Sequence, residues 1–117
     1  MSKNKIDLSG ENVWIKKDYP VLKDVAVNGN KCSFRVGDLP QIVMIELKID
    51  PKIPGQIMYR QSHVIHTPNQ AGGYRTSRPW AKTIVAALRL AIEGIVSRYE
   101  EAIKEGEKPD PSWLEQY

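Results

Sequence analysis

The feature that most constrains the fold is a long segment near the C-terminus in which apolar residues recur at helical spacing. We expect its helix to begin at Ser77 or Arg78 and to run to about Glu105. Ser77 can cap the first turn, and Pro79 is tolerated there because its missing N–H costs nothing. Gly106 can end the last turn. The chain must therefore build the rest of its core from shorter elements.

The segments before this helix have the composition of β-strands separated by turns. Asn28-Gly29 between two β-prone runs is a strong hairpin signal, because a type I′ turn needs positive φ at both central residues. The predicted strands are Val13–Lys17, Val21–Val27, Lys31–Val36, Gln41–Ile49 and Ile57–Ile65. We therefore predict an α+β fold, with an antiparallel sheet of four or five strands followed by one long C-terminal helix packed on it.

The strand expected at Ile57–Ile65 differs from the others because neither of its faces is cleanly apolar. Tyr59 and His63 alternate with Arg60 and His66 along it. Mixed faces of this kind are typical of a strand that carries a binding surface on one side.

The chain divides by composition into three parts. Residues 1–11 are polar and should form an N-terminal tail or loose strand, and residues 12–106 a single α+β domain. Residues 107–117 contain prolines and cannot continue the helix, yet Trp113, Leu114 and Tyr117 are costly to leave in water. We expect this segment to be a C-terminal docking tail, on this subunit or a neighbour.

The composition is that of a soluble globular protein, with 41% hydrophobic and 26% charged residues. No apolar run reaches the roughly 18 residues that a membrane span requires, and the first residues lack the apolar segment of a secretion signal. We therefore expect a cytoplasmic protein with no membrane partner. The single Cys32 has no internal disulfide partner, and its strand-like context favours a buried thiol. The net charge of +3 does not by itself indicate a nucleic-acid partner.

The connection from His66 to Trp80 combines glycines and prolines with many side-chain donors. Its arginines offer forked cationic donors, and its aromatic residues offer flat faces. The candidate ligand-binding residues are Arg60, His66, Thr67, Asn69, Gln70, Tyr74, Arg75, Thr76, Ser77, Arg78 and Trp80. This set suits an anionic, partly planar ligand. The alternative is a rigid loop that ties sheet to helix through its own hydrogen bonds.

The expected helix start adds to the argument for an anion, because a helix N-terminus favours negative charge. Arg75, Arg78 and Lys82 lie within about one turn of it and would form a phosphate site. Ala71-Gly72-Gly73 precedes the helix as phosphate-binding loops do, but it matches neither the Walker loop nor the dinucleotide fingerprint.

Metal and enzyme chemistry are less favoured by the residues present. His63 and His66 fall on opposite faces of the expected strand, and further zinc ligands are missing nearby, so we expect no metal and no cofactor. With Thr67 they resemble the paired His/Thr signature of phosphoesterases, but those enzymes need the motif twice. A phosphodiester-directed enzyme using His63 and His66 stays as an alternative to binding alone.

The leading hypothesis is a non-enzymatic binding protein, a sensor or a sponge, that captures a phosphate-bearing, nucleotide-like ligand through the 66–80 loop and the helix N-terminus. One alternative is an oligomeric module that binds single-stranded DNA or RNA across the sheet face bearing Arg60. A purely structural or partner-binding oligomer is another.

The apolar arc of the expected helix is wider than one sheet face needs. Ala87, Ala91 and Gly94 are also small enough to let a second helix approach closely. We therefore expect a homo-oligomer, a dimer or higher, that forms through the C-terminal helix. A helix gripped by a curved sheet is the alternative.

Overall fold

The computed structural model describes residues 6–70 and 79–117. Within these residues, five strands form an antiparallel sheet of order β1-β2-β3-β4-β6, and a long helix follows it. The elements are α1 (Glu11–Asp18), β1 (Leu22–Asn28), β2 (Lys31–Val36), β3 (Val43–Ile49), β4 (Ile57–Gln61), β5 (His63–Ile65), β6 (Trp80–Ala81), α2 (Ile84–Lys104), the 3-10 helix η1 (Pro111–Trp113) and β7 (Leu114–Gln116). The α+β class predicted from the sequence, an antiparallel sheet followed by a long C-terminal helix, is confirmed.

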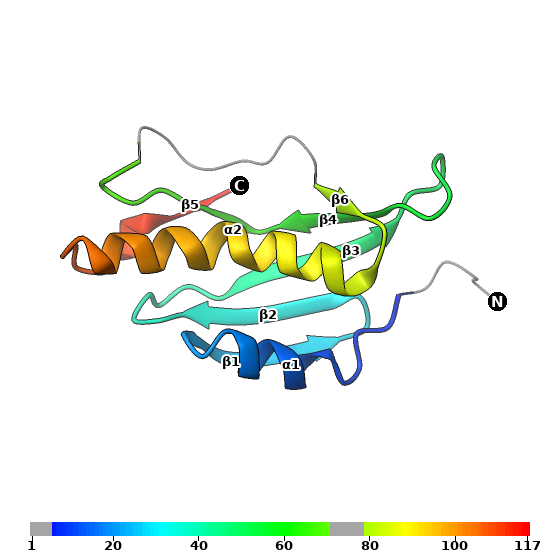
Figure 1. Ribbon diagram of the computed structural model, residues 1–117, viewed down its shortest axis with the longest axis horizontal. Coiled ribbons are helices and arrows are strands. Elements are labelled where there is room, and N and C mark those ends of the chain that lie inside the picture. Colours follow the sequence, from blue (N-terminus) through cyan, green and yellow to red (C-terminus); the bar gives the residue numbers. More distant parts are fainter. Residues whose placement is uncertain (1–5, 71–78) are drawn as a thin grey trace.

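Both α-helices cover the same face of the sheet, as Figure 1 shows. The alternation within β3 fixes which face this is: Val43, Ile45 and Leu47 are fully buried beneath the helices, whereas Met44 and Lys48 are exposed. We call the opposite side the outer face. Its strand residues are Lys23, Ala26, Asn28, Lys31, Ser33, Arg35, Met44, Glu46, Lys48, Met58, Arg60 and Trp80.

The hairpin between β1 and β2 forms where the sequence predicts it, but its turn lies one residue later. Asn28 pairs with Lys31, so the two-residue loop is Gly29-Asn30. Gly29 takes φ +61°, whereas Asn30 does not take a positive φ. One positive φ at the first central residue fits a type II′ turn, so the predicted type I′ turn is wrong.

The segment predicted as a first strand, Val13–Lys17, is part of the helix α1 instead. Glu11 lies in its first turn and accepts a 2.9 Å hydrogen bond from Trp14 Nε1, while two lysines lie in the last turn. Charges placed in this order favour a helix through its dipole. Ile15 is the buried residue of α1. Because one buried position shows no repeat, the five residues Val13–Lys17 do not distinguish the helical period from the strand period.

The long helix begins later than the sequence predicts, at Ile84 rather than at Ser77 or Arg78. Thr83 is its N-cap and accepts a 3.0 Å hydrogen bond from the backbone N–H of Ala86. Trp80 and Ala81, shortly before the helix, form the short strand β6, which pairs with β4. Strand pairing therefore overrides the Ser-Arg-Pro start signal, and a second cap residue downstream takes its place.

Most of the apolar arc of α2 packs against its own chain: Ala87 and Ala91 are buried in the core, whereas Val85, Leu90 and Ile103 are exposed. Self-association through this helix stays a prediction. The helix α1 lies beside α2, where Tyr19 Oη donates a 2.9 Å hydrogen bond to Glu93 Oε1. Arg89 forms a 2.6 Å ion pair with Asp18 and places its guanidinium 4.5 Å from the centre of the Trp14 ring.

The C-terminal segment packs on the domain through a second, two-stranded sheet in which β7 pairs with β5. Trp113 is buried, and its ring meets that of Tyr99 edge-on at 5.8 Å between centroids. Gln41 Nε2 donates a 2.6 Å hydrogen bond to the carbonyl of Pro111. The last residue, Tyr117, is thereby held beside the end of β4. Among the described residues, no helix is long and apolar enough to cross a membrane.

Candidate functional site

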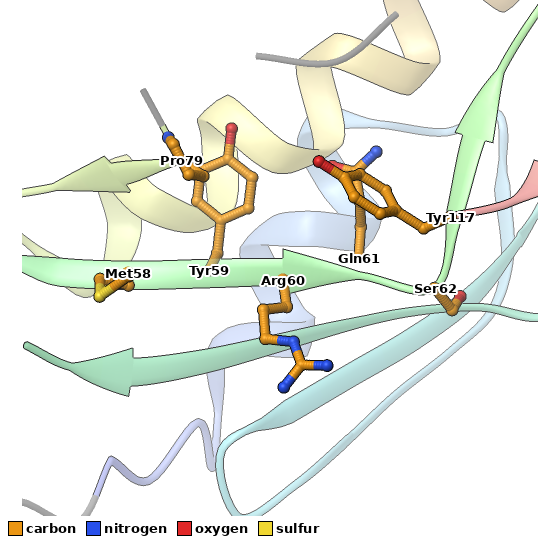
Figure 2. A pocket seen from close by; sticks show the side chains of 7 residues that line it. All are labelled: Met58, Tyr59, Arg60, Gln61, Ser62, Pro79 and Tyr117. Atoms are coloured by element: carbon orange, nitrogen blue, oxygen red, sulfur yellow. The ribbon is translucent and has the colours of Figure 1, made fainter. Parts of the chain in front are cut away.

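A cleft of about 380 Å³ lies along β4, between the start of β6 and the C-terminal residue. Figure 2 shows the side chains that line it, which are Met58, Tyr59, Arg60, Gln61, Ser62, Pro79 and Tyr117. Three segments distant in sequence thus meet at one place: β4, the residue before β6 and the end of the tail.

The alternation of β4 sends its side chains to both sides of the sheet. Figure 2 shows Arg60 leaving the strand on the side opposite to Tyr59 and Gln61. Tyr59 is buried on the helix side, while Met58 is exposed on the outer face. On that face Met58 pairs with Trp80, which is half-buried. The cleft therefore combines an aromatic wall with a cationic side chain that reaches onto the outer face.

Hydrogen bonds at the end of β4 position the rim of the cleft. Ser62 and Met44 exchange two of them, through Ser62 N to Met44 O at 2.9 Å and Met44 N to Ser62 Oγ at 2.8 Å. The Tyr117 backbone N–H donates to the Ser62 carbonyl at 3.0 Å. Gln61 Nε2 donates to the His63 carbonyl at 2.8 Å. These contacts fix the Tyr117 backbone against β4 while its side chain stays largely exposed.

A second, smaller hollow of about 180 Å³ lies on the outer face and shares part of its wall with the cleft. Arg60, Gln61 and Ser62 line both. The remaining lining residues of the hollow are Lys31, Met44 and Glu46. The β-ladder places Lys31 beside Glu46 and Glu46 beside Arg60, in one row across three strands.

The cations of the outer face fall into two groups. Lys23 and Arg35 are neutralised, by Asp38 at 3.4 Å and by Asp24 at 2.7 Å. Lys31, Lys48 and Arg60 take part in none of the four ion pairs found among the described residues. Lys31 and Arg60 line the hollow, and Lys48 lies next to Met58 in the ladder, so three cations outside these ion pairs lie in or beside the two cavities.

The residues predicted at 66–70 are engaged in hydrogen bonds within the fold. Thr67 is buried, and its hydroxyl bonds to the side chain of Asn69 and, at 2.9 Å, to Gln70 Oε1. Gln70 Oε1 also accepts from the Thr67 backbone N–H at 2.9 Å, and Gln70 Nε2 donates to the Ile65 carbonyl at 3.3 Å. These contacts make the segment a compact turn closed by its own side chains.

Two further contacts tie this turn to the rest of the domain. Asn69 Nδ2 donates to Glu105 Oε2 at 2.6 Å, which joins the turn to the end of α2. His66 Nδ1 lies 3.2 Å from Glu115 Oε1 in β7, and its Nε2 lies 3.2 Å from the Gln70 carbonyl. The geometry of residues 66–70 therefore matches the alternative of a structural tie between sheet and helix.

The other predicted site residues separate into those beside the cleft and those that are not described. Arg60 lines the cleft, and Trp80 lies on the outer face next to Met58. The predicted residues outside the described part of the chain are Tyr74, Arg75, Thr76, Ser77 and Arg78. The N-terminus of α2, predicted to hold phosphate with these arginines, is at Ile84 instead.

The two histidines have different partners. His63 Nδ1 lies 2.8 Å from Ser62 Oγ, and burial lowers the pKa of the His63 imidazole. His66 lies in the turn described above. Within the described residues, no group of three or more histidine, cysteine, aspartate or glutamate side chains could hold a metal ion.

The sequence did not identify Met58, Tyr59, Gln61, Ser62, Pro79 and Tyr117 as candidate site residues. The mixed faces of the 57–65 strand were the available signal for the first four. The contact of Tyr117 with Ser62 joins residues far apart in the chain, and no local pattern reveals it. No protein-family model, curated protein or solved structure matches this chain.

Proposed function

We propose that the chain is a non-enzymatic binding protein that captures a phosphate-bearing, nucleotide-like ligand in the cleft on β4. The observation that carries this proposal is a cleft of about 380 Å³ where β4, Pro79 and Tyr117 come together, with the Arg60 side chain leaving the same strand toward the outer face. Volumes of this order are typical of small-molecule sites, where apolar walls hold the ligand and a few polar groups orient it.

The chemistry of the lining matches the two parts of a nucleotide. Arg60 offers a planar fork of donors for phosphate oxygens, and such charge-assisted hydrogen bonds are among the strongest in proteins. Tyr117 offers an exposed ring on which a base can stack. Gln61 and Ser62 carry polar groups at the rim of the cleft, suited to the sugar or the base edge.

This proposal keeps the ligand class expected from the sequence and moves the site. The cleft uses Arg60 from the predicted set, and Pro79 from the end of the predicted loop. Residues 66–70 are left to their structural role because their side chains bond to one another, to α2 and to β7.

The test compares two arginine variants against a panel of nucleoside monophosphates by isothermal titration calorimetry. Arg60→Ala is expected to weaken binding by about 1.5–3 kcal/mol, the range for hydrogen bonds to a charged group. Arg98→Ala is the matched control, because Arg98 lines a separate hollow beside Thr67, Asn69 and Gln70. Loss of binding in Arg98→Ala but not in Arg60→Ala would move the site to the 66–70 turn, and an absence of binding in the parent protein would reject the proposal.

A further inference from the structure

We infer that the ligand is a phosphodiester-linked strand of at least two nucleotides, with one nucleotide in the cleft, the next in the outer-face hollow, and their linking phosphate on Arg60. This inference rests on the proposed function and names its ligand class. It starts from the shared wall, since Arg60, Gln61 and Ser62 line both cavities.

Arg60 lines both cavities. It is rooted in β4 beside the cleft and leaves the strand toward the outer face, opposite to Tyr59 (Figure 2). An arginine that lines two cavities is suited to an anion that connects two units, because the several N–H donors of its guanidinium point outward in one plane. A mononucleotide in the cleft would leave the hollow to water.

The hollow offers an apolar surface and a cation, the two features that a second nucleotide needs. Met44 is exposed on its floor and offers an apolar surface for a base. Lys31 lies two strands from Arg60 in the same cross-strand row, a separation of about 10 Å at the usual spacing of strands. A second phosphate beyond the linking one can therefore meet Lys31. Base contact on a sheet combined with cations along the backbone is how single strands are commonly bound.

The charge pattern favours a single strand over a neutral ligand of the same size. Lys31 and Arg60 line the hollow, Lys48 lies on the adjoining outer face, and none of the three takes part in an ion pair of the described residues. Glu46 is the one acidic side chain that lines the hollow within the described part of the chain, and it lies between Lys31 and Arg60 in the ladder. The Glu46 carboxylate lowers the affinity of the Lys31–Glu46–Arg60 row for anions, but the net charge of the row stays positive.

The experiment measures binding of a mononucleotide, the corresponding dinucleotide and a hexanucleotide to the parent protein, Lys31→Gln and Lys17→Gln. The dinucleotide should bind the parent about tenfold more tightly than the mononucleotide, the low end of what stacking one more base supplies. Lys31→Gln should remove part of the gain for the hexanucleotide and lower its salt slope by about 0.7, one phosphate contact of a single strand, while leaving mononucleotide affinity unchanged. Lys17→Gln, the same change on α1, should behave as the parent.

Failures of the two proposals are distinguishable in this series. Equal affinities for the mononucleotide and the dinucleotide would overturn the strand and leave the nucleotide site. Tight hexanucleotide binding that is indifferent to Lys31→Gln would also overturn it, because the strand would then run elsewhere. An absence of binding at every length would overturn the proposed function itself.

Discussion

Glu46 of β3 and Arg60 of β4 are register partners on the outer face of the sheet, but they form none of the four ion pairs found among the described residues. Both side chains line the same hollow. Facing cross-strand charges of opposite sign contribute modestly to stability when they are exposed. The carboxylate therefore affects an anionic ligand more than it affects the fold.

Glu46→Gln is expected to strengthen binding of a nucleotide by up to about 1 kcal/mol, since it removes a negative charge next to Arg60. Few substitutions in a binding site improve affinity, which makes the sign informative. Calorimetric titration at low salt checks it, and the effect should shrink as salt is added. Weaker binding in Glu46→Gln would mean that Glu46 contacts the ligand directly.

Thr67→Val tests the structural role of the 66–70 turn. The substitution keeps the shape of a buried side chain but removes the hydroxyl that bonds to Gln70 Oε1 at 2.9 Å. We expect a loss of about 1–3 kcal/mol in the free energy of unfolding, the cost of leaving a buried polar partner without its bond. Chemical denaturation measures this loss, and nucleotide affinity should stay within about twofold of the parent. A stable variant that no longer binds would instead place the ligand at this turn.

Tyr19→Phe tests the contact between α1 and α2. The Tyr19 hydroxyl donates to Glu93 Oε1 at 2.9 Å, and its removal should cost about 0.5–1.5 kcal/mol of stability at neutral pH. Because Arg89 contacts Asp18 and the Trp14 ring in the same cluster, the double variant with Arg89→Ala should lose less than the sum of the single losses. Strict additivity in denaturation experiments would show that these contacts act independently.

Cys32 gives the protein an alkaline limit to its stability. Burial raises the pKa of this thiol from 9.0 to about 11. The folded state therefore keeps a proton that the unfolded chain loses, so this contribution is present below pH 9.0 and is lost as pH rises through about 11. Burial, and then the hydrogen bond to Glu93, also raise the pKa of the Tyr19 phenol above its ordinary value of 10.0. Its contribution to stability is therefore lost only as pH rises above 10.0.

The measurement is the free energy of unfolding as a function of pH. Cys32→Ala should show a flatter decline than the parent between pH 9 and 10, where the thiol titrates before the phenol. The cavity left by the substitution lowers stability equally at each pH and does not change the slope. Identical slopes in the two proteins would show that Cys32 is not shielded from water.

The sheet and the long helix could be predicted from the sequence because their signals are local. Alternation in 41–49 identifies β3, and Gly29 marks the hairpin before β2. The wrong predictions concern segments whose local sequence is compatible with two different structures. Val13–Lys17 is too short to separate the two periodicities, and two cap residues, Ser77 and Thr83, compete for one helix.

The candidate site was harder to predict because long-range contacts create it. The sequence singled out Arg60 and Trp80, and both lie at or beside the cleft. It also singled out residues 66–70 by their donors, but donors in a loop bond equally well to one another. Tyr117 comes to the cleft through pairing of β7 with β5 and its own hydrogen bond to Ser62, which depend on the whole fold.

The most direct test of the β4 cleft as a nucleotide site is an amide chemical-shift titration of the labelled protein with a nucleoside monophosphate and, separately, with the matching nucleoside. We expect both ligands to shift the Gln61 and Tyr117 amides. The monophosphate should act at lower concentration and should also shift the Arg60 side-chain N–H signal, because only it carries the phosphate. Shifts confined to residues 66–70, or identical titrations with both ligands, would contradict this assignment.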